Sequence, residues 1–206
     1  MGKQRNSILI AFNSCPDDSS HSFFQSCADE ARQLCADASI PCASKTGDDL
    51  AEQMVMQSME SHSFCIFASH GSYDSIVDEK GNDVISTRTT NYVFSGKGLY
   101  AISCRCARSL MPELCRIGLS LFVGYEDEIR FSGDESVFVD CALSGLRSFV
   151  SGKCLSQAKE DMLSSFDEAI KKAGESPNPF EKMFLLHDKE SLVFCGDPEL
   201  TLADLS

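Results

Sequence analysis

Short apolar runs separated by helical patterns constrain the fold of this chain most. Four stand out: SILIAF from residue 7, SFCIFASHG from residue 63, GLYAISC from residue 98 and LSLFVGY from residue 119. An apolar run of strand length between polar residues is typical of a strand buried on both faces of a parallel sheet. We therefore expect these runs to form a sheet whose two faces are covered.

The segments between the runs supply the covering layers. A weaker strand is expected around Ile40 to Ala43, a final strand and turn at 191–202, and a long loop or small hairpin at 72–97. Helical spacing of apolar residues is found at 22–38, 47–59, 106–118, 135–149 and 155–173. This alternation predicts one three-layer α/β domain over residues 1–206, with a largely parallel sheet of about six strands and right-handed crossovers.

Cysteine usage bears on the compartment. The chain has eleven cysteines, which would suggest disulfides in a small secreted protein. Here they lie mostly inside apolar runs, the apolar stretch at the N-terminus is too short for a signal peptide, and no run approaches a membrane span. We expect a reducing, cytoplasmic location, no membrane association, and core packing for Cys65, Cys141, Cys154 and Cys195.

The charge balance limits the partners. A formal net charge of −13 makes unspecific attraction to nucleic-acid phosphates or anionic lipid unfavourable, because both need a positive surface. Basic polypeptide partners suit this charge better. The alternative is that the acidity only keeps the protein in solution.

Two reactive residues follow neighbouring predicted strands. His70 ends the run that begins at residue 63, and Cys104 ends the run that begins at residue 98. They are 34 residues apart, which suits one crossover between adjacent parallel strands. Because ligands bind at the carboxyl ends of strands in open α/β sheets, we expect both side chains to face one cleft.

This pair predicts acyl-transfer chemistry. A Cys104 thiolate can attack a peptide carbonyl while His70 donates a proton to the leaving amine. The amides of Gly71 and Cys104 could form an oxyanion hole. Cys104 is expected at the start of the next helix, where the helix dipole stabilises a thiolate, and Cys106 is the less suited nucleophile because it would point from the first helical turn.

Several motifs in order resemble a known family. Ser-His-Gly and Ile-Ser-Cys after apolar strands, followed by GYEDEIRF, SGKCLSQA and CGDPELTL, resemble the CHAT branch of the caspase-fold (clan CD) cysteine peptidases between Phe64 and Leu202. The resemblance implies a caspase-hemoglobinase fold, a His70/Cys104 dyad without an obligatory third member, a protein substrate and a regulatory partner protein or subunit. The sequence departs from the family pattern at Arg105 and Cys106.

The resemblance also suggests a substrate pocket. In such peptidases the loop after the first strand and the strand after the catalytic cysteine line the pocket for the residue before the cut. These places hold Asp17 or Asp18, and Glu126 or Asp127. A carboxylate facing that pocket would select Lys or Arg. The alternative is that these acids are solvated loop residues.

Other readings remain open beside the peptidase. Cys104 and Cys106 form one Cys-x-Cys without a second pair, so we expect no metal site, and no motif indicates a cofactor. His21, His62 and His187 are expected at the surface. The chain could instead be an inactive caspase-like scaffold that binds a partner protein, or a flavodoxin-like module that binds a small ligand at the same sheet edge.

Overall fold

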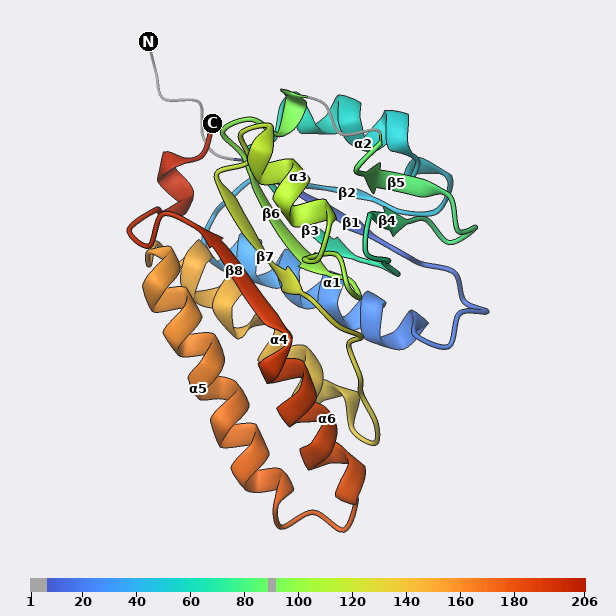
Figure 1. The fold of residues 1–206 in the computed structure, drawn as a ribbon, viewed down its shortest axis with the longest axis vertical. Coiled ribbons are helices and arrows are strands. Elements are labelled where there is room, and N and C mark those ends of the chain that lie inside the picture. Colours follow the sequence, from blue (N-terminus) through green and yellow to red (C-terminus); the bar gives the residue numbers. More distant parts are fainter. Residues whose placement is uncertain (1–6, 89–91) are drawn as a thin grey trace.

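A six-stranded sheet forms the centre of the computed structural model, which describes residues 7–88 and 92–206 (Figure 1). Its strand order is β2-β1-β3-β6-β7-β8. The first five strands are parallel, and β8 runs antiparallel to β7. The bounds are β1 Ile8–Phe12, β2 Cys42–Lys45, β3 Phe64–Ala68, β6 Gly98–Ile102, β7 Leu121–Tyr125 and β8 Leu192–Gly196. This confirms the predicted α/β class and the largely parallel sheet.

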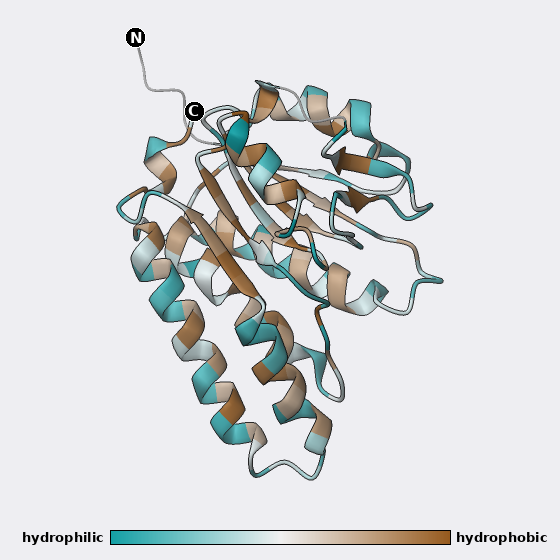
Figure 2. Ribbon diagram, viewed as in Figure 1, coloured by the Kyte–Doolittle hydropathy of each residue, from teal (hydrophilic) through white to brown (hydrophobic). Residues whose placement is uncertain are grey.

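Alternating side chains of the strands divide the core into two layers. In β1, Ile8 and Ile10 face one apolar cluster, whereas Leu9 and Ala11 face the other. Successive side chains of a strand point to opposite faces, so a strand that is apolar throughout needs cover on both sides. Figure 2 shows these brown strands between helices whose outer surfaces carry teal, hydrophilic residues.

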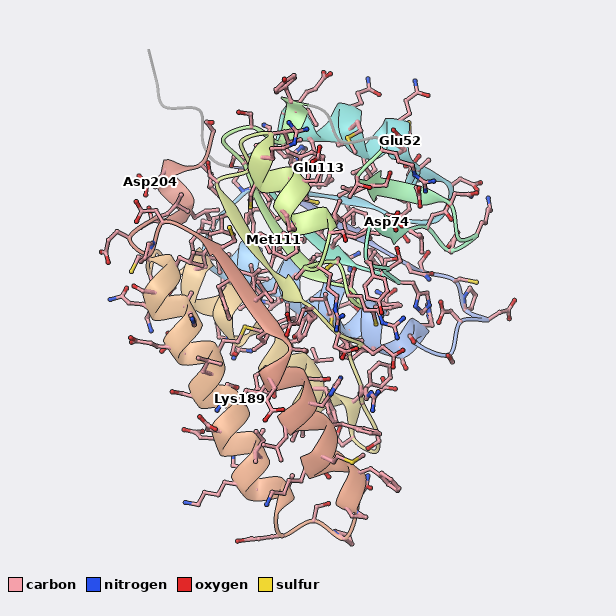
Figure 3. All side chains as sticks on the ribbon, viewed as in Figure 1. Glu52, Asp74, Met111, Glu113, Lys189 and Asp204 are labelled. Carbon is pink, nitrogen blue, oxygen red and sulfur yellow. The ribbon has the colours of Figure 1, made fainter. Side chains whose placement is uncertain are left out.

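Helices cover both faces of the sheet. The first cluster takes buried side chains from α1 (His21–Asp37), α4 (Glu135–Val150), α5 (Leu155–Ala173) and α6 (Pro179–Glu190). The second takes them from α2 (Glu52–Met59), α3 (Leu110–Arg116) and the hairpin of β4 (Ser75–Val77) and β5 (Asp83–Ser86). Short 3-10 turns lie at Gly47–Asp49, Tyr92–Phe94 and Leu202–Asp204. Figure 3 labels Glu52 on α2, Asp74 before β4, and Met111 and Glu113 on α3, all from this second layer.

Four elements differ from the sequence prediction. The helix expected at 47–59 is a 3-10 turn at Gly47–Asp49 followed by α2, which begins only at Glu52. Helix α6 was not expected, and its Leu185 joins the core. The helix after Cys104 begins at Leu110 instead of residue 106, because the carbonyl of Tyr73 accepts the amides of Ser109 and Leu110 where that helix starts. The weak strand lies at 42–45 and is mostly exposed at the sheet edge. Among the described residues, no helix is long and apolar enough to cross a membrane.

Candidate active site

His70 and Cys104 occupy equivalent positions on neighbouring strands. Ala68, the last residue of β3, pairs with Ile102, the last residue of β6, and each reactive residue follows two positions later in the chain. Ala68 and Ile102 both face the first apolar cluster. Because side chains two apart along an extended chain share a face, this register directs His70 and Cys104 to the same side of the sheet, at its carboxyl edge.

The imidazole of His70 is held by a carboxylate. Its Nε2 lies 2.5 Å from Oδ2 of Asp18, and because an ionised carboxylate only accepts, Nε2 carries the proton. Asn13 Nδ2 donates to the same oxygen at 2.9 Å, and the Ser20 amide donates to Oδ1 at 2.8 Å. The Phe24 ring packs edge-on against the imidazole at 5.1 Å between ring centres. Among the described residues Nδ1 of His70 has no hydrogen-bond partner, and it is the nitrogen without the proton.

The charge state of Asp18 follows from these contacts. Burial alone would raise the pKa of this carboxyl, but the Ser20 amide, His70 and Asn13 together lower it below its usual value. Asp18 is therefore ionised at neutral pH, and it stabilises the charge that His70 gains when it takes up a proton. The sequence prediction put Asp18 or Asp17 at the substrate pocket; the structure places Asp18 on the histidine and leaves Asp17 exposed.

Cys104 is half-buried under the segment that follows β7. The amide of Ile129 donates to its Sγ at 3.4 Å. Burial raises the pKa of the Cys104 thiol, the Ile129 amide opposes that rise, and the charges of Glu128 and Asp188 add to it. In the described part of the chain His70 and Cys104 are not hydrogen-bonded to each other. The thiol is consequently protonated in this resting arrangement.

The backbones of Gly71 and Cys104 lie against each other. A methyl group built on Gly71 would lie 2.6 Å from the Cys104 carbonyl oxygen and 3.2 Å from the Cys104 nitrogen, so the two backbones touch. Within residues 7–88 and 92–206 neither the Gly71 nor the Cys104 amide has a hydrogen-bond acceptor. Unused donors next to a nucleophile are the geometry that an oxyanion hole requires. Only glycine at position 71 permits this approach.

The turn after Cys104 separates it from Cys106. Arg105 has a positive φ of 61°, and its amide donates to the Asp127 carbonyl. Cys106 is fully buried in the second cluster, where its Sγ donates to the Ser103 carbonyl at 3.2 Å and burial raises its pKa to about 12. We expected Cys104 at a helix N-terminus, but α3 starts six residues later. A helix dipole therefore does not lower its pKa.

The acids after β7 are engaged by arginines of the chain itself. Asp127 lies 4.0 Å from Arg105 Nε and 3.8 Å from Arg108 Nη2, while Glu128 pairs with Arg105 and, at 3.4 Å, with Arg130. Glu126 is exposed, and its backbone carbonyl accepts from Arg108. The expected pocket acids Glu126 and Asp127 therefore lie in the segment beside Cys104, but Asp127 already has cationic partners.

Three contributors to this site escaped the sequence reasoning. Asn13 is fully buried and orients Asp18. The backbone amide of Ile129 contacts the thiol. The buried carboxyl of Asp188 on α6 exerts an electrostatic effect on Cys104. Asp188 had one available signal, since it lies three residues after buried Leu185 on the apolar side of a helix. No group of three or more potential metal ligands occurs among the described residues.

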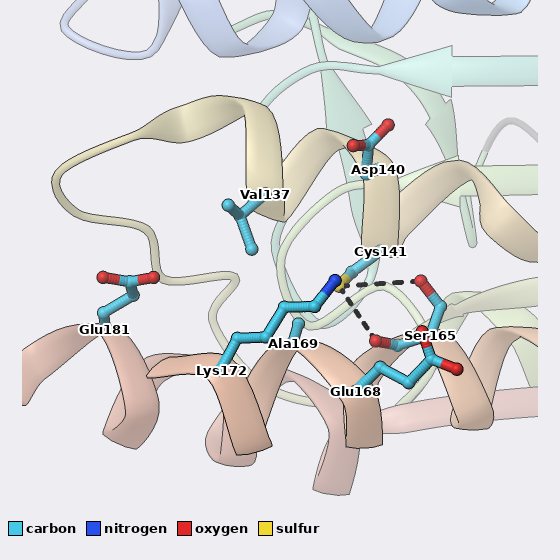
Figure 4. A pocket seen from close by; sticks show the side chains of 8 residues that line it. All are labelled: Val137, Asp140, Cys141, Ser165, Glu168, Ala169, Lys172 and Glu181. Carbon is cyan, nitrogen blue, oxygen red and sulfur yellow. Dashed lines mark hydrogen bonds between the residues drawn. The ribbon is translucent and has the colours of Figure 1, made fainter. Parts of the chain in front are cut away.

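A separate cavity of about 180 Å³ lies between α4, α5 and α6 (Figure 4). It shares no lining residue with the dyad. It is lined by Val137, Asp140, Cys141, Ser165, Glu168, Ala169, Lys172 and Glu181. The Cys141 thiol contacts the Ser165 carbonyl at 3.8 Å, and burial raises its pKa to about 11, which disfavours the thiolate.

Comparison with known proteins identifies the fold. No protein-family model matches the chain, and no curated protein matches it. Among solved structures the chain is similar to gingipain R, described as an Arg-specific cysteine proteinase, with a TM-score of 0.68 and 9% identity. The match covers 97% of this chain and 48% of gingipain R, so the chain spans about half the length of that protein. At this identity the likeness establishes the fold alone: a caspase-like α/β fold found in a clan CD cysteine proteinase.

Proposed function

We propose that this protein is a cysteine endopeptidase in which Cys104 is the nucleophile and His70 the general acid and base. The observation that carries the proposal is the register of β3 and β6, which puts the two residues on one face of the sheet at its carboxyl edge. The unused amides of Gly71 and Cys104 add the donors that a tetrahedral intermediate needs. The structural likeness to a cysteine proteinase supports the same reaction class.

In the proposed reaction, Cys104 forms a bond to the substrate and His70 moves the protons. Nδ1 of His70 takes the Cys104 proton as Sγ attacks the substrate carbonyl carbon, and the carbonyl oxygen becomes an oxyanion beside the two amides. Nδ1–H then donates its proton to the leaving nitrogen, which gives an acyl-enzyme and a free amine. Water deprotonated by His70 attacks the thioester, and the acid product leaves as Sγ recovers a proton. Asp18 keeps the proton on Nε2 throughout.

Proton removal and attack are coupled in this scheme. Because burial raises the pKa of Cys104, little thiolate exists before substrate binds. His70 must therefore remove the proton from Sγ during the attack. At that stage the Ile129 amide either moves away from Sγ or remains its hydrogen-bond donor. A capped thiol of this kind also suits the latent state of a peptidase that a partner protein or subunit activates, which we include in the proposal.

For the substrate we propose a protein cut after a basic residue. The described specificity of gingipain R and the acids Glu126 and Asp127 beside the nucleophile support this choice. A substrate arginine would replace Arg105 or Arg108 at Asp127. The test is a peptide library that varies the residue before the cut, with Asp127→Asn as the variant. Equal cleavage after Arg, Ala and Glu would refute the basic preference and leave the dyad untouched.

The dyad itself is tested by comparing wild type with Cys104→Ala, His70→Ala and Cys106→Ala on a mixed peptide library. Activity should vanish in the first two variants and persist in the third. Cleavage by Cys104→Ala at the wild-type rate would contradict the mechanism. A specific observation favours one alternative, the inactive scaffold: the thiol is capped and not bonded to His70. An electrophilic peptide probe would label a competent Cys104 and leave a scaffold unlabelled.

The proposal includes a cytoplasmic location and a single-domain organisation. All eleven cysteines are free thiols, and the pKa of the buried ones is raised, which suits the reducing environment of the cytoplasm. We also propose that the chain acts as one domain, because α6 and β8, near its end, pack into the same core as β1.

A further inference from the structure

The segment Glu126–Arg130, which we call the strap, joins the nucleophile to the C-terminal end of α6. On the nucleophile side, the Ile129 amide donates to Cys104 Sγ, and the Asp127 carbonyl accepts the Arg105 amide at 3.0 Å. On the other side, the strap contacts three residues at or just after the last turn of α6. The strap is therefore bonded both to the turn that carries the thiol and to this helix.

Those three contacts are well defined. Asp188 Oδ1 accepts the Arg130 amide at 2.9 Å, His187 Nε2 lies 3.0 Å from the Glu128 carbonyl, and the Ser191 carbonyl accepts the Glu126 amide at 2.8 Å. Asp188 and Ser191 are both buried, at 2% and 4% exposure, and of these two Asp188 is the one that uses its side chain in this contact. Its own carbonyl accepts the Ser191 hydroxyl, which fixes the end of the helix.

The decisive geometry lies in two successive amides. Ile129 N–H donates to the thiol, and the next amide along the chain, Arg130 N–H, donates to the Asp188 carboxyl. The two N–H groups belong to adjacent planar peptide units that meet at the Ile129 Cα, so only φ and ψ of Ile129 separate them and fixing the second limits the direction of the first. We propose that Asp188 is a positioning residue for Cys104: by accepting the Arg130 amide it holds the Ile129 amide on the sulfur, and its charge acts on the same thiol.

The groups around Asp188 support a coupled role. Burial raises the pKa of Asp188 to about 8, against the opposing effects of the Arg130 amide and guanidinium. Burial is the main cause of the raised pKa of Cys104, of Tyr125 on β7 and of Cys141 on α4, and the charge of Asp188 adds to each of these shifts. The neighbouring side chains on α6 have other partners: His187 contacts the Glu128 carbonyl, and Lys189 donates to the Asp167 carboxylate. Asp188 therefore has a pKa near neutral pH, and the strap connects it to Cys104.

The two effects on the thiol have opposite signs and can be separated. The acceptor keeps an N–H donor on the sulfur, which favours thiolate; the charge disfavours thiolate. Asp188→Asn keeps an acceptor oxygen and removes the charge. Asp188→Ala and the bulkier Asp188→Leu remove both, so the difference between them and Asn isolates the acceptor. Leu fills the space that Ala would leave empty, and either variant that folds by circular dichroism completes the comparison.

The experiment measures alkylation of Cys104 by iodoacetamide from pH 5 to pH 10, followed on the Cys104 peptide by mass spectrometry. Compared with wild type, Asn should move the midpoint of the profile to lower pH. Ala or Leu should place it about one unit above Asn, the shift that loss of one hydrogen bond to a charged sulfur produces. Exposed Cys42, at the opposite edge of the sheet, is the internal control and should not shift.

Two results would overturn the inference: an Asn midpoint equal to that of wild type, or an Ala or Leu midpoint equal to that of Asn. The inference rests on the proposed function only for its catalytic consequence. Alkylation reports the thiol whether or not peptide is cleaved, so failure of the peptidase assay and failure of this test are distinguishable. If both hold, kcat for peptide cleavage should follow the alkylation midpoint across the variants.

Discussion

Asp18 Oδ2 and His70 Nε2 lie 2.5 Å apart, in residues separated by 52 positions in the sequence. The contact brings the loop after β1 to the end of β3, where His70, the proposed general base, lies. Since Asn13 and the Ser20 amide also bind this carboxylate, the loop delivers one fixed, charged partner to the imidazole. The resemblance implied a dyad without an obligatory third member, and this geometry adds a residue that orients the histidine.

Replacing Asp18 should lower catalysis more than binding. Asp18→Asn offers the imidazole a neutral partner that can present an N–H group, which disfavours the tautomer with a basic Nδ1. We expect kcat to fall by at least about tenfold with little change in KM, since loss of the orienting carboxylate costs far more than that in a serine triad. Steady-state cleavage of one peptide measures it. Exposed Asp17→Asn is the matched control, and an equal loss there would point to a general disturbance of the loop.

The same carboxylate should contribute to stability against acid. Its pKa is lowered in the folded protein, so the folded state resists protonation of Asp18 more than the unfolded state does. Its contribution is present above the ordinary pKa near 4 and is lost as the pH falls through the lower, folded value. Urea unfolding at pH 6 and pH 3 should show a smaller acid-induced loss of stability in Asp18→Asn than in wild type. An equal loss would contradict the assignment.

The two cysteines after β6 should respond in opposite ways. Cys104→Ala should abolish cleavage and leave the free energy of unfolding nearly unchanged, because the thiol is only half-buried. Cys106→Ala should keep the activity and destabilise the fold by about 1–2 kcal/mol, because it removes a fully buried sulfur and leaves a small cavity. Denaturant unfolding and a peptidase assay on the same preparations separate the effects. Lost activity in a folded Cys106→Ala would argue against this division of roles.

Gly71 should not tolerate a side chain. The methyl group of Gly71→Ala would lie 2.6 Å from the Cys104 carbonyl oxygen, so the strand ends that carry the dyad must separate. We expect loss of most activity in a protein that still folds, because the conflict is confined to this edge. Gly174→Ala, where the backbone is helical at the end of α5, is the control and should behave as wild type. Normal turnover by Gly71→Ala would exclude an oxyanion hole at this position.

Asp188 should make stability depend on pH in the opposite sense to Asp18. Its pKa is raised to about 8 when folded, so between pH 4 and pH 8 the folded state holds a proton that the unfolded state has lost. Stability falls with rising pH across this window, by at most about 1.4 kcal/mol per pH unit from this group. Asp188→Asn should therefore gain stability relative to wild type at pH 8 and less at pH 5. Chemical denaturation at both values measures the difference.

The sequence predicted the parts of the site that depend on local patterns. Apolar runs located β1, β3, β6 and β7, and the reactive residues that follow two of them gave the candidates His70 and Cys104, whose roles stay a prediction. This works because a strand buried on both faces must be apolar throughout, and parallel strands end at a common edge.

What the sequence did not predict depends on contacts between distant segments. The role of Asp18 requires the loop after β1 to fold toward β3, and Asp18 and Asp17 look alike in the sequence. Helix α6 was not predicted because two of its apolar residues, Phe180 and Met183, are exposed. The apolar residues therefore do not follow the spacing of one buried helix face. The helix expected at Cys106 starts later, because hydrogen bonds to Tyr73 and Asp127 hold the turn after Cys104.

The antiparallel direction of β8 has a consequence for how the site is made. Because Leu192 pairs with Tyr125, the start of β8 and the end of α6 lie at the edge that carries His70 and Cys104 instead of the opposite one. During synthesis, His70 and Cys104 leave the ribosome long before His187, Asp188 and Ser191, which contact the strap. The chain therefore acquires its reactive residues early and the supports of the thiol late, so a nascent fragment that lacks α6 carries an unsupported cysteine.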